Sequence, residues 1–464
     1  MALTIPVAEI VESSKNPLLG KHESWGRVLL GDIATIQNGF PFKSSQFTRD
    51  EGMPLIRIRD VGGDSSDTNY VGAYDPAFIV KAGDLLIGMD GDFNCARWRG
   101  PDGLLNQRVC RVILKSDIYH PKLLDYALPG YLKAINDMTS SVTVKHLSSK
   151  SIAEIPLPLP PMDQQKRIVA EIEKQFSRLD EAVANLKRVK ANLKRYKAAV
   201  LKDAVEGRLV ETEAELARRE GRSYETGAQL LQRILETRRS QWKGKGKYKE
   251  PVAPDTSDLP ELPEGWVWAL LNQLSDVVRG GSPRPAGDPR YFGGPVPWIT
   301  VGPLTADESD YLHRVPEGLT LEGKERSRYI EPDTLLLTNS GATLGVPKIS
   351  LIGGCINDGV AALLDVDYPL KRYLVNFLRT KTMSMRRINQ GAAQPNLNTS
   401  IIKAMIVPLP PEAEQQRIIA EVDRRLSLLR ETEALVDANL QRAERLRQSI
   451  LANAFSGRIS DSFQ

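Results

Sequence analysis

Apolar residues recur every seven positions in two long stretches of the chain, with mostly polar residues between them. The first series is Ile172, Leu179, Leu186, Leu193 and Val200, and the second is Val422, Leu429, Val436, Ala443 and Ile450. A sustained period of seven predicts long helices that pair through one apolar stripe as a coiled coil. Each helix is expected to run for about 45 residues, or about 65–70 Å at 1.5 Å per residue.

Both stretches begin and end with the same signals. Pro158-Leu-Pro-Pro161 leads into the first and Pro408-Leu-Pro-Pro411 into the second, 250 positions later, and each is followed by the pattern x-x-x-Gln. Proline suits the first turn of a helix, and Gly207 and Gly457 stand where a left-handed C-terminal cap is expected. A constant offset indicates a duplicated element, whose obvious partner is its own copy. The alternative is a rod that only mediates dimerisation.

A globular-sized segment precedes each helix. Lys81-Ala-Gly-Asp-Leu-Leu-Ile-Gly88 matches Glu331-Pro-Asp-Thr-Leu-Leu-Leu-Thr338, again 250 positions apart, and both runs are typical of buried strands bounded by turns. Two copies of a mixed α/β domain, each followed by a long helix, are therefore predicted. The predicted divisions are an N-terminal arm (1–24), a first domain (25–160), a central helix (161–209), a helical segment with a basic, proline-rich linker (210–262), a second domain (263–410), and a distal helix with a C-terminal tail (411–464).

Composition places the chain among ordinary globular proteins. It has 464 residues, is 41% hydrophobic and 26% charged, and carries a formal net charge of +4. No apolar run approaches the 18 or so residues of a membrane span, and the N-terminus lacks the pattern of a signal peptide. The three cysteines are in no metal-binding spacing, which fits a reducing compartment. A cytoplasmic location is expected.

The charge distribution says more than the total. Between Lys187 and Arg208 there are eight basic and two acidic residues, whereas Glu412 to Arg458 balances eight against eight. A mixed-charge helix face is usually just solvated, whereas the basic excess of the first run indicates a polyanionic partner.

Motifs for catalysis are missing from the sequence. It has no GxxxxGK[ST] phosphate loop and no HExxH, and its four histidines are isolated. Asp75-Pro76-Ala77-Phe78 approaches the Asn/Asp-Pro-Pro-aromatic tetrad of amino-methyltransferases but lacks the second proline, so a turn is the favoured interpretation. No catalytic and no metal-binding residue is predicted.

Binding residues are more plentiful in both domains. Arginine, glutamine and asparagine are the side chains that read base edges in the major groove, and spare cations hold phosphates. A single surface arginine is more often a salt-bridge partner, so the prediction depends on the set. The candidates for contact with DNA are Arg57, Arg59, Arg97, Arg99 and Arg108 in the first domain and Arg284, Arg290, Arg328, Lys348 and Gln394 in the second.

Two diverged α/β domains, each followed by a Pro-Leu-Pro-Pro-x-x-x-Gln-x-x-Ile helix that ends near Ala-x-x-Gly-Arg, resemble the specificity subunit of type I restriction–modification enzymes. The resemblance covers about residues 25–210 and 263–460. It implies two target recognition domains, each reading half of a split site in double-stranded DNA. It also implies an antiparallel helix pair with pseudo-twofold internal symmetry, which acts as a ruler and docks two methyltransferase subunits.

In such enzymes the specificity subunit is not catalytic. The resemblance implies that S-adenosylmethionine is bound by the methyltransferase subunits, which methylate adenine, and that ATP and Mg²⁺ serve the motor-nuclease (restriction) subunits. No cofactor is expected on this chain. Two alternatives stay open: a self-contained DNA-modifying enzyme, which would need a cofactor motif, and a coiled-coil scaffold without a DNA role, which would not need two arginine-bearing domains.

Overall fold

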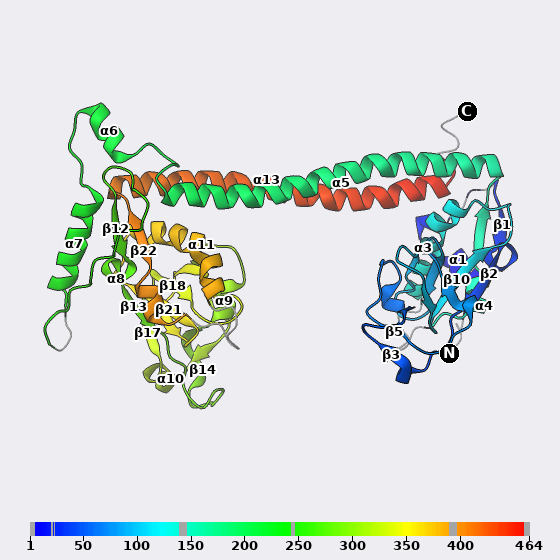
Figure 1. Cartoon of the computed structure of the whole chain (residues 1–464), viewed down its shortest axis with the longest axis horizontal. Helices are drawn as coiled ribbons and strands as arrows, with labels where there is room; N and C mark the ends of the chain where they lie inside the picture. Colours follow the sequence, from blue (N-terminus) through cyan, green and yellow to red (C-terminus); the bar gives the residue numbers. More distant parts are fainter. Residues whose placement is uncertain are drawn as a thin grey trace. The chain divides into compact units, whose positions relative to one another are not determined.

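The computed structural model of the protein describes residues 5–19, 22, 24–138, 146–242, 246–388 and 397–458. The chain forms two compact units, unit 1 with residues 1–188 and 436–464 and unit 2 with residues 189–435. The two long helices, α5 (Met162–Val205) and α13 (Glu412–Phe455), each run from one unit into the other (Figure 1). Each unit therefore contains one α/β domain and one half of each long helix.

The domain of unit 1 combines three small sheets with short helices. Its helices are α1 (Val7–Ser13), α2 (Leu30–Ile33), α3 (Pro121–Met138) and α4 (Ser149–Ala153). Its strands are β1 (Gly26–Leu29), β2 (Ala34–Asn38), β3 (Phe47–Thr48), β4 (Met53–Ile56), β5 (Asn69–Tyr70), β6 (Ile79–Val80), β7 (Leu85–Gly88), β8 (Cys95–Arg97), β9 (Gly103–Leu105), β10 (Val109–Leu114) and β11 (Pro156–Leu159). They form the sheets β1-β11, β2-β10-β7-β8 and β3-β5-β4-β9-β6.

The N-terminal segment belongs to the core of unit 1. Val7, Ile10 and Val11 of α1 are buried in the same apolar cluster as α3 and the first half of α5. The segment predicted as an N-terminal arm thus contributes one short helix to the core, because three apolar residues at positions i, i+3 and i+4 suffice for it to bury a face.

The domain of unit 2 has the corresponding parts and several additions. Its helices are α6 (Glu213–Glu220), α7 (Gly227–Ser240), α8 (Leu271–Leu274), α9 (Val301–Thr305), α10 (Leu321–Glu325), α11 (Leu370–Ile388) and α12 (Thr399–Lys403). Its strands are β12 (Val267–Leu270), β13 (Asp276–Arg279), β14 (Phe292–Ile299), β15 (Tyr311–Leu312), β16 (Gly318–Leu319), β17 (Arg328–Ile330), β18 (Thr334–Thr338), β19 (Pro347–Ser350), β20 (Gly354–Ile356), β21 (Val360–Leu364) and β22 (Ile406–Leu409). They form the sheets β12-β22, β13-β21-β18-β19-β15 and β16-β14-β20-β17.

Sheet order shows which strands of the two domains correspond. The run β2-β10-β7-β8 in unit 1 matches β13-β21-β18-β19 in unit 2, and β4 pairs in parallel with β9 as β14 does with β20. The mixed α/β class and the internal duplication predicted from the sequence are confirmed.

The repeated motif before each long helix is a buried anchor. Gln165 and Gln415 are fully buried, and each donates its side-chain N–H to a proline carbonyl five residues earlier, Pro160 or Pro410, at 2.9 Å. At the other end, Gly207 (φ +70°) and Gly457 (φ +80°) take the predicted left-handed conformation. The repeated residues therefore fix where each long helix starts and ends.

The two long helices run in opposite directions within each unit. In unit 1, Ile172 and Leu179 of α5 share an apolar cluster with Ala443 and Ile450 of α13. In unit 2, Val200 of α5 shares a second cluster with Val422 and Leu429 of α13, and the partly buried Leu193 packs against it. Val436 is buried and Leu186 is half-buried. All ten residues of the two predicted series thus lie at buried or half-buried positions.

The segment between the first long helix and the second domain packs onto unit 2. Gly227 donates its backbone N–H to Gly265, and a Cβ there would lie 2.4 Å from the carbonyl oxygen of Leu409, so only glycine fits at the start of α7. Arg233 of α7 pairs with Glu412 at the start of α13. Helices α6 and α7 lie within the segment 210–262, for which a helical part was predicted.

Candidate nucleic-acid interface

One edge of each α/β domain is built by the same close approach of two segments. Gly39, after β2, donates its N–H to Val109, and Gly280, after β13, donates its N–H to Val360, both at 2.9 Å. A Cβ on Gly39 would lie 2.0 Å from the backbone oxygen of Asn106, and a Cβ on Gly280 would lie 2.2 Å from that of Asn357. Both glycines are therefore required by backbone contact.

Two further segments meet at this edge in each domain. The residue after the end of β7, Met89, accepts a hydrogen bond from Leu147, and its counterpart Asn339 accepts one from Leu397. The first edge is defined as residues 38–40, 90, 106–108 and 146. The second edge is defined as residues 279–284, 339–340 and 357–359 together with Arg328.

The first edge holds a small polar cluster around Arg108. Arg108 has a left-handed backbone (φ +73°) at the position where the second domain has Gly359, which is an uncommon conformation for a side-chain-bearing residue. Its Nη1 lies 3.5 Å from Asp90 Oδ1 and 3.2 Å from His146 Nδ1, and the two latter atoms are 2.6 Å apart. The guanidinium of Arg108 remains exposed and is held beside an acceptor and an imidazole.

The second edge fixes two arginines through backbone carbonyls. Arg328 donates from Nε to the carbonyl oxygen of Arg279 at 2.9 Å, and Arg279 donates from Nε to that of Asp358 at 2.8 Å. Within the described part of the chain, their terminal amino groups make no hydrogen bond or ion pair. Arg284 Nη2 lies 3.8 Å from Asp358 Oδ2. A guanidinium held at Nε with free terminal groups suits two-point binding to a guanine edge or a phosphate.

The remaining candidates of the first domain lie close by or are engaged elsewhere. Arg57 precedes the short turn Ile58–Asp60 after β4, Arg59 lies within it, and Arg99 donates to the carbonyl oxygen of Gly62 in the loop that follows. These three arginines therefore gather around one loop. Arg97 points instead to Asp125 of α3, with 2.6 Å between Nε and Oδ2, so it serves the packing of α3 on β8.

One candidate of the second domain does not match its predicted role, and a second is paired within its own loop. Lys348 is only 1% exposed and pairs with Asp307, because β19 directs its side chain into the domain. Arg290 is exposed but its Nε and Nη2 both bind Asp288, which leaves it less available. Gln394 lies outside the described residues.

Sequence reasoning missed several members of the edges. Asp90, His146 and Asp358 come from turns whose neighbours in space are distant in sequence. The available signal was the glycine that directly follows a short strand at both Gly39 and Gly280.

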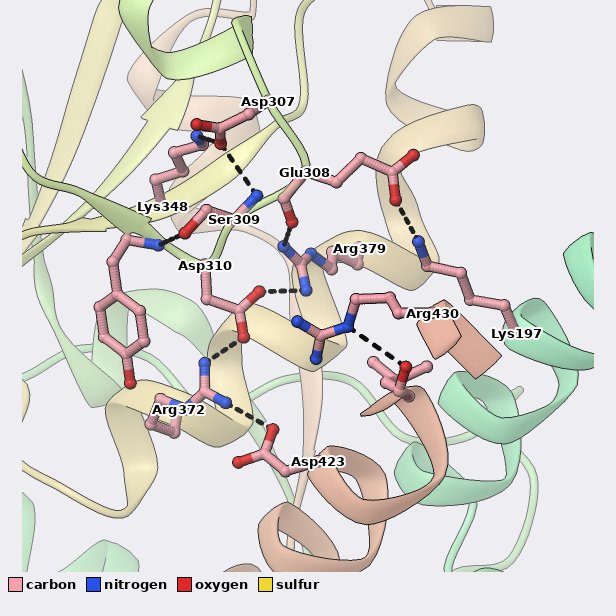
Figure 2. A network of polar contacts seen from close by, with 12 residues as sticks. Lys197, Asp307, Glu308, Ser309, Asp310, Lys348, Arg372, Arg379, Asp423 and Arg430 are labelled. Carbon is pink, nitrogen blue, oxygen red and sulfur yellow. Dashed lines mark hydrogen bonds and ion pairs between the residues drawn. The ribbon is translucent and has the colours of Figure 1, made fainter. Parts of the chain in front are cut away.

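Figure 2 shows how the domain of unit 2 is joined to the long helices. Asp310, just before β15, pairs with both Arg372 and Arg379 of α11, and Arg372 also binds Asp423 of α13 at 2.7 Å. Burial works to raise the pKa of the Asp310 carboxyl, but Arg379 and Arg372 together hold it below its usual value. Lys197 of α5 pairs with Glu308 of the same loop. We call these residues the charged joint.

Comparisons with known proteins agree with this architecture. Residues 22–195 and 263–433 match the family described as "Type I restriction modification DNA specificity domain". The chain is 33% identical to the type I restriction enzyme EcoBI specificity subunit of Escherichia coli, covering 97% of this chain and 90% of that one. It is 21% identical to the EcoKI specificity subunit of Escherichia coli K12, covering 94% and 90%.

A solved structure shares the fold. It comes from work on complex assembly and conformational transition of a type I restriction–modification system, with a TM-score of 0.59, 20% identity, and coverage of 94% of this chain and 98% of that chain. The family match and the fold identify a DNA-recognition protein built from two duplicated domains. The chain belongs to the family of type I restriction–modification specificity subunits.

Among the described residues, no helix is both long and apolar enough to cross a bilayer. No group of three or more potential metal ligands is found in the same part of the chain.

Proposed function

We propose that each α/β domain reads one half of a two-part DNA site through its edge. The observation that carries this proposal is the repetition of the edge in both domains on different side chains. Arg108 and His146 stand at the first edge, and Arg279 and Arg328 stand at the second. A common backbone frame with divergent polar groups is what independent reading of two different half-sites requires.

The proposal is tested by exchanging residues 25–155 for the same domain of a relative with a different site. Methylome sequencing should show a new sequence in one half of the methylated motif and no change in the other. A change in both halves together would show that the domains do not read independently. Exchange of the second domain, which should alter only the other half, is the matched control.

We further propose that the helix pair sets the spacing between the half-sites. Helices α5 and α13 have 44 residues each, about 65 Å at 1.5 Å per residue. Insertion of seven residues between Leu186 and Leu193 keeps the apolar register and lengthens one helix by about 10 Å. Because B-DNA advances about 3.4 Å per base pair, the unread spacer should grow by one to three base pairs, that is by about 10 Å or less. An insertion variant that keeps the original spacing would contradict the proposal.

The partners belong to the same proposal. We propose that two methyltransferase subunits, which bind S-adenosylmethionine, dock on the helices, that restriction subunits add ATP- and Mg²⁺-dependent chemistry, and that this chain is not itself catalytic. Helix α13 supports docking because Leu428, Leu435 and Leu446 are exposed, Leu435 to 65%. Leu428→Glu with Leu435→Glu should reduce co-purification of partner subunits at least ten-fold. Leu321→Glu, an exposed leucine of α10, is the control and should leave co-purification unchanged.

A further inference from the structure

The segment between α6 and β12 carries a concentration of positive charge that the half-site proposal does not use. Between Arg233 and Lys249 there are seven lysines and arginines and one glutamate. The described part of this run places Arg238, Trp242, Lys247, Tyr248 and Lys249 around one pocket of about 560 Å³. We call these five residues the insert patch.

Aromatic contacts give the insert patch a defined shape. Trp242 donates its indole N–H to the carbonyl oxygen of Gly246 at 3.3 Å, and its ring packs edge-on against Tyr248 with centroids 5.6 Å apart. Arg238 donates to the carbonyl oxygen of Asn272 in α8, which fixes the end of α7 to the second domain. The lysines on either side of Tyr248 are therefore presented from a packed loop.

The free cations of the patch are its two lysines. Arg239 is occupied by Glu250, and Arg233 is occupied by Glu225 and Glu412. Lys247 and Lys249 are exposed and make no ion pair within the described part of the chain. Trp242, 48% exposed, lies beside them. An exposed tryptophan with unpaired lysines is typical of a surface that a partner covers.

The charge of the pocket decides what kind of polyanion fits. Asp276 and Asp365 also line the pocket, and Asp276 lies 3.9 Å from Lys403, so a small anion that entered the pocket would meet two carboxylates. A long polyanion does not have to enter the pocket, because Lys247 and Lys249 are exposed and can bind it from outside. The sugar–phosphate backbone of duplex DNA has this form, with about one charge per 1.7 Å of helix axis.

The insert patch also lies near the second edge. Asp276 begins β13 and Asp365 follows β21, whereas Arg279 and Asn357–Gly359 of the second edge stand at the opposite ends of the same two strands. A four-residue strand at about 3.3 Å per residue spans about 10 Å, close to three base pairs of duplex. In unit 2, the last turn of α7 and strand β17 both lie on the side away from the long helices (Figure 1).

We propose that the insert patch binds the phosphate backbone of the duplex outside the half-site that the second domain reads. The inference rests on the proposed function only in that DNA is present at the second edge. Lys247 and Lys249 supply sequence-independent affinity, and Trp242 and Tyr248 hold them in place. The patch contributes to binding strength and to its salt dependence, and leaves the choice of bases to the edges.

The test compares two double variants of the full chain in the complex with which it co-purifies. Lys247→Gln with Lys249→Gln removes two charges from the patch. Arg218→Gln with Arg219→Gln removes two charges from exposed residues of α6 in the same insert and serves as the matched control. Affinity for a fluorescein-labelled 60-base-pair duplex of random sequence is measured by anisotropy between about 50 and 200 mM salt, the range in which phosphate contacts dominate.

The lysine variant should lower the slope of log K against log[salt] by about 1.8, or about 0.9 for each lost phosphate contact. Affinity at low salt should fall about ten-fold or more, and the methylated motif should stay the same. Lys247→Arg with Lys249→Arg should restore the slope. The α6 control should keep the wild-type slope.

An unchanged slope in the lysine variant overturns the proposal. If a co-purifying subunit is lost as well, the patch binds an acidic protein surface instead of DNA. The random duplex contains no recognised site, so this result is independent of the half-site proposal. That proposal fails separately, if domain exchange alters both halves of the motif.

Discussion

In unit 2 the α/β domain is joined to the long helices through an apolar cluster and through buried charges, whereas in unit 1 it is joined through an apolar cluster and the charges are exposed. Arg372, 8% exposed, bridges Asp310 and Asp423 in the charged joint (Figure 2). In unit 1, Tyr126 of α3 meets Phe176 of α5 edge-on at 5.6 Å, and Arg447 of α13 lies over the Phe176 ring at 4.2 Å.

The contacts of the two units differ in how strictly they fix the orientation of the domain on the helices, as well as in strength. An apolar contact tolerates small shifts of a domain on its helices, because the free energy depends mainly on buried area. A buried arginine with two carboxylate partners does not, because any shift leaves an uncompensated charge. The domain of unit 2 is therefore held in one orientation on its half of the helix pair, and the domain of unit 1 is held less strictly on its half.

The largest expected effect comes from Arg372→Met. The substitution leaves Asp423 and part of the Asp310 charge without a partner, so the free energy of opening α11 should fall by about 3–5 kcal/mol. Hydrogen exchange measured by mass spectrometry resolves α11 from the rest of the chain. Arg447→Met in unit 1 is the control and should cost about 1 kcal/mol, because its pair with Asp180 is exposed. Equal losses at the two sites would remove the distinction between the joints.

Acid should weaken the charged joint within a defined range of pH. The pKa of Asp310 is lowered in the folded protein, so its stabilising contribution is complete above the unfolded pKa of about 3.9 and is lost as pH falls through the folded pKa. Protection of α11 should drop below about pH 4 by more than that of α3. In Asp310→Asn the protection should already be lower at pH 7, and its difference from the wild type should shrink as pH falls. A constant difference between pH 7 and pH 3 would contradict this assignment.

A smaller effect on stability, a gain instead of a loss, is expected where the two long helices begin. Trp25 donates its indole N–H to Gln164 in unit 1, and Trp266 donates to Glu414 in unit 2, both at 3.0 Å. Burial raises the pKa of the Glu414 carboxyl, although Trp266 and the backbone N–H of Glu213 donate to it. The folded protein therefore binds this proton more tightly than the unfolded chain, and the charged form lowers stability at neutral pH.

Glu414→Gln introduces the residue that unit 1 has at the equivalent position, Gln164, and keeps an acceptor for Trp266. We expect a gain of up to about 1 kcal/mol at pH 7, the scale of one hydrogen bond, and no gain at a pH low enough to protonate Glu414. Thermal unfolding of the variant and the wild type at the two pH values measures the difference in stability at each. A loss of stability at pH 7 would show that the negative charge at the start of α6 outweighs its desolvation.

The smallest effect is expected at the exposed end of the charged joint. Glu308 is paired with Lys197 but is largely exposed, so Glu308→Gln should change the free energy of opening α11 by about 0.5 kcal/mol or less. The same hydrogen-exchange measurement gives this value. A loss comparable to that of Arg372→Met would mean that the attachment of the domain depends on α5 instead of α13.

The sequence by itself determined the parts of the protein that follow from local periodicity. The seven-residue spacing from Ile172 to Val200 and from Val422 to Ile450 predicted two long helices, and the caps at Gly207 and Gly457 were predicted from the same offset. Glutamines at 165 and 415 marked the helix starts, although their role as buried anchors needed the structure. These features are readable because each depends on residues that are close in sequence.

Only the tertiary structure decided which polar residues meet. Lys348 and Arg328 are both basic residues near strands, yet one is buried against Asp307 and the other is exposed at the second edge. The partners of Arg108 and Arg372 come from segments some 18 to 62 positions away, as with Asp90 and Asp310. Such contacts are set by how strands and helices pack into a sheet, since the direction of a side chain depends on the register of its strand as much as on its identity.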